Sequence, residues 1–93
     1  MDKLYFFEKI KPLLAKYSIE QKSYKNGDFG DLESIAIEGK NKYVTIEFWS
    51  SGWLGIDAIN HVLGKNLINI MIPPDKIEKQ EEAMNDLLKI LLD

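Results

Sequence analysis

Short turn signals recur along the middle of this chain, and each one separates segments in which apolar and polar residues alternate. Asn26-Gly27 favours the positive φ angles of a tight hairpin turn, and the tripeptide Gly-Lys-Asn stands twice, at Gly39-Lys40-Asn41 and Gly64-Lys65-Asn66. Alternation with a period of two is typical of strands that bury one face. The pattern predicts strands at residues 19–25, 29–38, 42–50, 53–60 and 67–72. Because the turns are short, we expect a meander of four or five antiparallel strands.

A helical period precedes the strands. The pattern recurs at intervals of three and four, at Leu4, Phe7, Ile10 or Lys11, Leu14 and Tyr17, and Asp2 is placed to cap the first turn. These features predict an amphipathic helix over residues 3–17. Pro12 lacks an N–H and its ring crowds the preceding turn, so we expect the helix to bend near Glu8 or to split.

A second helix follows the last strand. Pro73-Pro74 ends that strand, and Asp75 with Glu78 three residues later resembles a capping box. The helix then has an apolar stripe made of Ile77, Gln80 or Glu81, Met84, Leu87, Leu88 and Leu91. The order predicts an α+β two-layer sandwich, in which N-terminal and C-terminal helices cover one face of the sheet.

Length and composition restrict the class of protein. A chain of 93 residues forms a single domain, 1–93, and 45% hydrophobic with 29% charged residues is typical of a soluble globular protein. No apolar run is long enough to cross a membrane, and no signal peptide is evident, so we expect a cytoplasmic protein. The chain has no cysteine, which excludes thiol chemistry. A net charge of −3 argues against nucleic acid as a partner.

Alternation also predicts which side chains lie on which face. In the third strand, Val44, Ile46 and Phe48 form the aliphatic side, which we assign to the core; Leu54, Ile56 and Ala58 continue it in the fourth strand, and Ile68, Ile70 and Ile72 in the fifth. The opposite side then carries Tyr43, Glu47, Trp49, Trp53 and Asp57. Aromatic anchors beside carboxylates on an uncovered face are typical of protein–protein interfaces.

Two interpretations of the tryptophans are open. Trp49 and Trp53 flank the turn Ser50-Ser51-Gly52, and they either anchor a partner or pack on one another or under the connection 60–66 to close the core. Asp31 and Glu33, with Asp28, extend the acidic character towards one edge and are expected at the rim of an interface.

No residue set for catalysis, a metal or a cofactor is evident. His61 is the only histidine and is interpreted as a polar loop residue, and Gly27–Asp31 lacks the ligand spacing of a calcium loop. Glu47 and Asp57 as a glycosidase pair would need a cleft that the sequence does not indicate. We therefore predict that the chain is not an enzyme and binds no cofactor.

One family resemblance can be named. The phrase Ile46-Glu47-Phe48-Trp49-Ser50-Ser51-Gly52 followed by Ile56-Asp57, in a small acidic chain without cysteine and with a helix–meander–helix order, resembles immunity proteins of bacterial polymorphic toxin and contact-dependent growth inhibition systems. The resemblance implies a non-enzymatic protein that binds and neutralises one cognate toxin, with a nuclease toxin domain as the expected kind. It transfers no residue roles.

The leading hypothesis is an inhibitor-type binding module, as a monomer or weak dimer. Tyr43, Trp49 and Trp53 supply apolar anchors, while Glu47, Asp57, Asp31 and Glu33 complement basic residues of the toxin. Two alternatives stay open: a chaperone for a secreted effector, and a small-molecule-binding domain that uses the tryptophan-lined face as a pocket.

Overall fold

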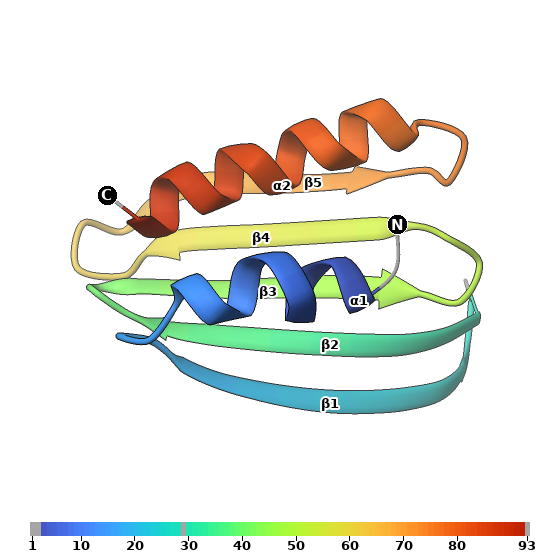
Figure 1. Cartoon of the computed structure of the whole chain (residues 1–93), viewed down its shortest axis with the longest axis horizontal. Helices are drawn as coiled ribbons and strands as arrows, with labels where there is room; N and C mark the ends of the chain where they lie inside the picture. The colour runs from blue at the N-terminus through green and yellow to red at the C-terminus, as the bar shows by residue number, and fades with distance from the viewer. Residues whose placement is uncertain (1–2, 29, 93) are drawn as a thin grey trace.

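The chain forms one five-stranded antiparallel sheet with helices on one of its faces (Figure 1). A computed structural model describes residues 3–28 and 30–92; the predicted cap Asp2 and residue Phe29 lie outside this range. The strands are β1 (Ser18–Gly27), β2 (Gly30–Gly39), β3 (Lys42–Trp49), β4 (Leu54–Asn60) and β5 (Lys65–Ile72), and they pair in sequential order. The predicted α+β class and two-layer meander are confirmed.

The hairpin between β2 and β3 has the predicted turn. Gly39 pairs with Lys42, and the two residues between them, Lys40 and Asn41, have φ angles of 48° and 64°. Positive φ at both central positions is the backbone that matches the twist of the flanking strands. Asparagine tolerates this conformation well, so the sequence signal was sufficient here.

The first hairpin turns later than predicted. Gly27 pairs with Gly30, so Asn26 and Gly27 belong to β1 and the prediction that they form the turn was wrong. The register shifts between Tyr24 and Gly27, which adds a residue to β1 and carries the strand past the expected position. Gly30, with φ of 99°, supplies the positive φ instead.

The last hairpin is a four-residue loop. Asn60 pairs with Lys65, so of the predicted turn Gly64-Lys65-Asn66 only Gly64, with φ of 64°, lies in the loop. The Asn60 side chain shapes the loop, because its Oδ1 accepts hydrogen bonds from the N–H groups of Val62 at 3.1 Å and Leu63 at 3.0 Å. The assignment of Lys65 and Asn66 to the turn was wrong, since both belong to β5.

The N-terminal helical segment is irregular, as Pro12 predicts. A short α-helical turn, α1 (Lys3–Tyr5), is followed by a π-helical turn at Phe6–Ile10 and a 3₁₀ turn at Lys11–Leu13. The N–H of Lys11 bonds to the carbonyl of Phe6 in the wider π pattern. The segment ends at Leu13 and not at residue 17, because Leu14 leaves the helical backbone region with φ of −109° and ψ of 39°.

The C-terminal helix α2 (Ile77–Leu92) is regular and begins later than predicted. The first helical bond shown at its start runs from the N–H of Gln80 to the carbonyl of Lys76 at 3.0 Å. The capping box at Asp75 and Glu78 was therefore wrong by one residue. The helix buries Gln80, Ala83, Met84, Leu87 and Leu91, whereas Ile77 is exposed.

The core lies between the sheet and both helical segments. Phe6, Ile10 and Leu14 pack from the first segment and Met84, Leu87 and Leu91 from α2 against the inward residues of β2, β3 and β4, which include Ile35, Ile37, Val44, Ile46, Phe48, Leu54, Ile56 and Ala58. The inward assignments for β3 and β4 are confirmed. In β5 only Ile72 is buried; Ile68 is half-buried and Ile70 is 39% exposed. The edge position of β5 explains this difference.

Candidate docking face

The face of the sheet opposite the helices carries no second layer among the described residues. Cross-strand pairs place its side chains in rows: Tyr43 stands between Glu38 and Ile59, and Thr45 stands next to Asp57. Tyr43 is 41% exposed and Asp57 is also exposed. Tyr43, Glu47 and Trp49 follow one another along β3, so this side of the strand spans roughly 20 Å. The predicted assignment of these side chains to one surface agrees with the pairing.

The two tryptophans mark one end of this face. The N–H of Trp49 donates to the carbonyl of Trp53 at 3.1 Å, and the N–H of Gly52 donates to the carbonyl of Trp49 at 2.9 Å, so the turn between them is closed by backbone bonds. Gly52 has φ of 98°, and a Cβ added there would lie 2.7 Å from the Cβ of Pro74. Only glycine fits this turn without displacing the residues that follow β5.

Both tryptophans are half-buried, so they are neither fully exposed as partner anchors nor fully packed into the core. A Cβ added at Gly27 would lie 3.2 Å from Cζ3 of Trp49, so the indole packs over the end of β1. The connection 60–66 follows the other end of β4, and packing of the indoles under it is excluded by the strand register. Trp49 therefore packs against the end of the first hairpin and is half-buried as a residue.

Gln80 holds this end of the sheet to α2, and its role was not predicted. The side chain is fully buried, and its Nε2 donates to the carbonyls of Gly52 at 2.9 Å, Ile72 at 3.1 Å and Pro73 at 3.1 Å. These acceptors belong to the turn between the tryptophans and to the end of β5. A buried amide that donates to carbonyls of two separate segments fixes their relative positions, so Gln80 sets the place of the tryptophan turn.

The region between the two exposed tyrosines is shallow. Tyr24 and Tyr43, which are 51% and 41% exposed, flank a depression of about 140 Å³ that has Ser34, Ala36 and Thr45 in its lining. A second depression of about 190 Å³ adjoins it beside Glu38. Small-molecule sites are usually enclosed and measure roughly 300–1,000 Å³, so both depressions are smaller than a usual small-molecule site.

The open face is acidic. Alternation and register place four carboxylates on it, Glu20, Glu38, Glu47 and Asp57, together with one lysine, Lys22, which lies 3.9 Å from Glu20. Glu47 is half-buried and lies over Gly55, where an added Cβ would be 3.1 Å from its Oε1. Gly55 thus leaves room for the carboxylate of Glu47 to lie close to the sheet. Such a surface favours a basic partner.

Glu33 does not belong to this face, and its predicted place at a rim with Asp31 was wrong. It pairs with Ser23 and the buried Phe48, and its carboxylate meets Lys3 at 3.2 Å on the helix side. Hydrogen bonds from Gln21 and Ser23, both 2.8 Å long, and the nearby Lys3 lower the pKa of the Glu33 carboxyl from its ordinary value of 4.5. Glu33 therefore has a structural role.

Asp31 and His61 are both exposed. The backbone of Asp31 joins the first hairpin to the tryptophan turn: its N–H donates to Oγ of Ser50 at 2.9 Å, and its carbonyl accepts from the N–H of Ser50 at 2.8 Å. Asp31 therefore lies at the end of the sheet beside that turn. His61 lies in the loop before β5, as expected. Residues 3–28 and 30–92 contain no group of three or more histidine and acidic side chains that could hold a metal ion.

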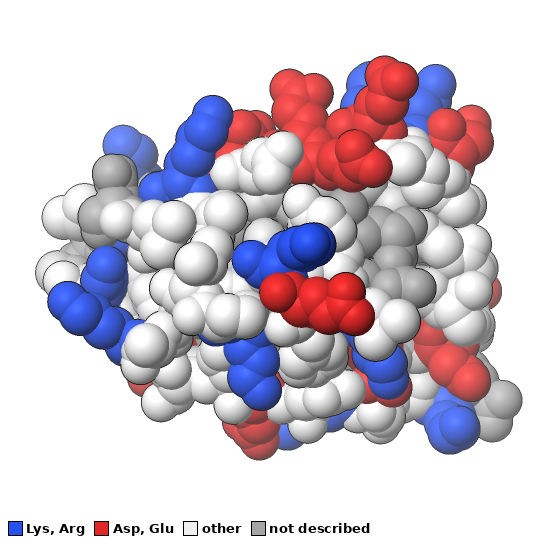
Figure 2. All heavy atoms as spheres, viewed as in Figure 1, with Lys and Arg blue, Asp and Glu red and all other residues white. Residues whose placement is uncertain are grey.

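The helix-covered side of the molecule is also charged. Figure 2 shows that acidic side chains gather over α2, whose sequence contains Glu78, Glu81, Glu82 and Asp86 alongside Lys79 and Lys89. In the part of the chain that the structure describes, no helix has the length and apolar character needed to cross a bilayer. No family model, no curated protein and no solved structure matches the chain.

Proposed function

We propose that the chain is a cytoplasmic immunity protein, without enzymatic activity, that binds one cognate bacterial toxin through the open face of its sheet and neutralises it. The observation that carries this proposal is the open face itself, which combines exposed Tyr43 and Tyr24 and the half-buried tryptophans with four carboxylates. A protein that meets its partner over a flat surface needs aromatic anchors and complementary charge, and this face has both.

A nuclease toxin is the partner whose chemistry fits this surface. A nuclease binds a phosphate backbone and therefore presents lysine and arginine around its active site. The carboxylates Glu38, Glu47 and Asp57 lie on neighbouring strands and would pair with such residues. Blocking that basic surface would exclude the nucleic acid substrate. A complex of this kind buries roughly 1,200–2,000 Å² in total.

The shape of the surface supports binding of a protein over binding of a small molecule. The two depressions on the open face, of about 140 and 190 Å³, are shallow and adjoin one another along β1, β2 and β3. Aromatic side chains at their margins would insert into pockets of the partner, while the carboxylates would be partly desolvated around them.

Co-expression tests the proposal. Genes next to that of this chain are searched for one that encodes a large protein with a C-terminal toxin segment, and that segment is produced in a bacterium with and without the chain while growth is followed. We expect the segment to arrest growth alone and the chain to restore it. A chain that neither restores growth nor binds the purified segment would contradict the proposal.

Variants of the anchors then locate the interface. Replacing Trp49 and Trp53 together by alanine should weaken binding of the segment by orders of magnitude, because aromatic anchors dominate the affinity of such interfaces. The exposed Leu92 of α2 offers a control, since Leu92→Ala removes an apolar side chain from the helix end. Unchanged affinity of a folded double variant would remove the tryptophans from the interface.

A further inference from the structure

The two edges of the sheet differ in how they are protected from pairing with another strand. β1 carries Glu20, Lys22 and Lys25 and contains a register shift, which are features that discourage pairing. β5 has the sequence KNLINIMI, in which Lys65 at its first position is the only charged residue. Ile70 and Met71 of β5 are 39% and 42% exposed. The outer edge of β5 is therefore long, apolar and open. Edge strands with these properties readily pair with a strand of another chain.

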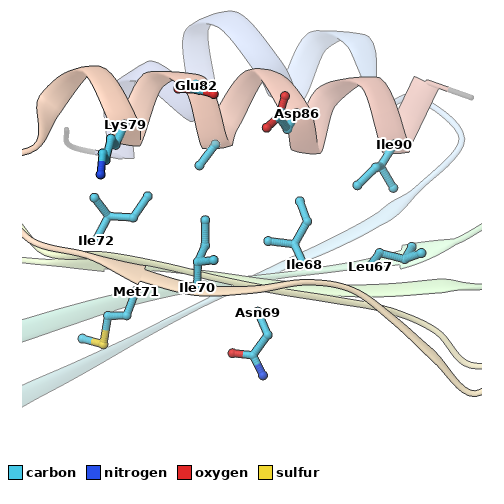
Figure 3. A pocket seen from close by; sticks show the side chains of 11 residues that line it. Leu67, Ile68, Asn69, Ile70, Met71, Ile72, Lys79, Glu82, Asp86 and Ile90 are labelled. Atoms are coloured by element: carbon cyan, nitrogen blue, oxygen red, sulfur yellow. The ribbon is translucent and has the colours of Figure 1, made fainter.

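An apolar groove lies along this same edge. It measures about 720 Å³ and is lined only by residues of β5 and α2. Figure 3 shows Ile68, Ile70 and Ile72 pointing from β5 towards the helix, while Asn69 and Met71 point to the other side. Lys79, Glu82 and Asp86 of α2 stand above the isoleucines. The groove accounts for the exposure of Ile70 on the side of the sheet where its neighbours in β3 and β4 are buried.

We propose that a second copy of the chain covers this edge, with β5 paired antiparallel to the partner's β5 about a twofold axis at Ile70. In this register Ile70 meets the partner's Ile70, and Ile72 meets the partner's Ile68. All three isoleucines of one groove then lie against those of the other. The two sheets become one continuous sheet of ten strands, and no edge of β5 remains open.

The isoleucines select this register, and the charges of α2 favour a second copy as the occupant. Figure 3 places Lys79 above Ile72 and Asp86 above Ile68, on either side of Ile70. The twofold axis that joins Ile72 to the partner's Ile68 therefore brings Lys79 towards the partner's Asp86, and the symmetry repeats the pair. A shift of the axis by one residue, to Asn69 or Met71, would leave Ile72 or Ile68 without a partner isoleucine and would separate Lys79 from the partner's Asp86.

Glu82 restrains the strength of this dimer. It stands above Ile70 in the groove, so the two copies of Glu82 lie close to the axis and repel one another. Two ion pairs at exposed positions add little affinity by themselves, and they act mainly on register. We expect a dimer that dissociates on dilution and that Glu82→Gln tightens. The proposal does not depend on the proposed function, because the open face stays accessible in the dimer.

Sedimentation of the full chain at a series of concentrations up to about 1 mM tests the proposal. Variants that place like charges opposite one another at the axis should weaken the dimer. The unchanged chain should pass from monomer to dimer. Ile70→Lys places two lysines at the axis and should weaken association roughly 100-fold. Tyr24→Lys, at an exposed position on the other edge strand β1, should leave it unchanged.

A charge exchange separates this dimer from any other. Lys79→Glu should weaken association because it faces the partner's Asp86, and the double variant Lys79→Glu with Asp86→Lys should restore it. A chain that stays monomeric throughout, a dimer that survives Ile70→Lys, or a double variant no tighter than Lys79→Glu alone would each overturn the proposal. Circular dichroism of every variant keeps loss of folding distinct from loss of association.

Discussion

The two faces of this sheet are built from the same strands and the same alternation, yet they serve different ends. On β3 the inward residues Val44 and Ile46 are fully buried, and their neighbours Tyr43 and Glu47 remain in contact with solvent. The covered face concentrates apolar contacts and supplies stability. The open face carries aromatic and acidic residues that no other part of the isolated chain covers. Substitutions on the two faces should therefore separate stability from binding.

The largest expected effect is on the covered face. Ile46→Ala removes a fully buried side chain from the centre of the core and should lower the free energy of unfolding by about 2–5 kcal/mol. Glu47→Gln, one residue along the same strand on the open face, should change it by less than about 0.5 kcal/mol. Urea denaturation of both variants measures the contrast. Similar losses for the two would contradict the assignment of faces.

The next effect is at Gln80, where the covered face supports the open one. Gln80→Leu keeps the volume but leaves the carbonyls of Gly52, Ile72 and Pro73 without this donor, and should cost about 1–3 kcal/mol of unfolding free energy. Because Gly52 lies between the tryptophans, their fluorescence should shift as well. Asn85→Leu, at an exposed amide on the same helix, is the control, and an equal loss there would show that Gln80 does not hold the two segments together.

The smallest effect concerns acid. The hydrogen bonds from Gln21 and Ser23 lower the pKa of Glu33 in the folded chain, so its contribution to stability is present above the unfolded pKa and is lost as pH falls through the folded one. Thermal unfolding below the ordinary value of 4.5 should reveal the loss. Glu33→Gln should flatten the dependence on pH, and Ser23→Ala should reduce it. If the stability of Glu33→Gln depends on pH as strongly as that of the unchanged chain, another group is responsible for the acid sensitivity.

Local patterns predicted the architecture because each strand carries its own period and each helix its own stripe. Val44, Ile46 and Phe48 could be placed in the core from alternation alone, and Lys40-Asn41 could be recognised as a turn. Alternation could also have placed Glu33 correctly. It shares the parity of Ile35 and Ile37, so alternation already placed it on the covered face.

Other features depended on contacts between distant residues. The register shift in β1 moved the first turn beyond Asn26-Gly27, and the turn preferences of these two residues do not predict such a shift. The position of Gln80 on the apolar side of α2 could be predicted from the helical period. Its hydrogen bonds could not, because their three acceptors belong to residues 52, 72 and 73, which are distant in the sequence. The exposure of Ile70 follows from the edge position of β5, which only the assembled sheet defines.

One titration tests the assignment of the open face most directly. Asp57→Lys reverses an exposed carboxylate on that face, and Glu81→Lys does the same on α2, the other acidic surface of the molecule. Calorimetry with the purified toxin segment should show affinity reduced about tenfold or more by Asp57→Lys and unchanged by Glu81→Lys. The reverse result, with Glu81→Lys weakening the complex and Asp57→Lys leaving it intact, would contradict the account.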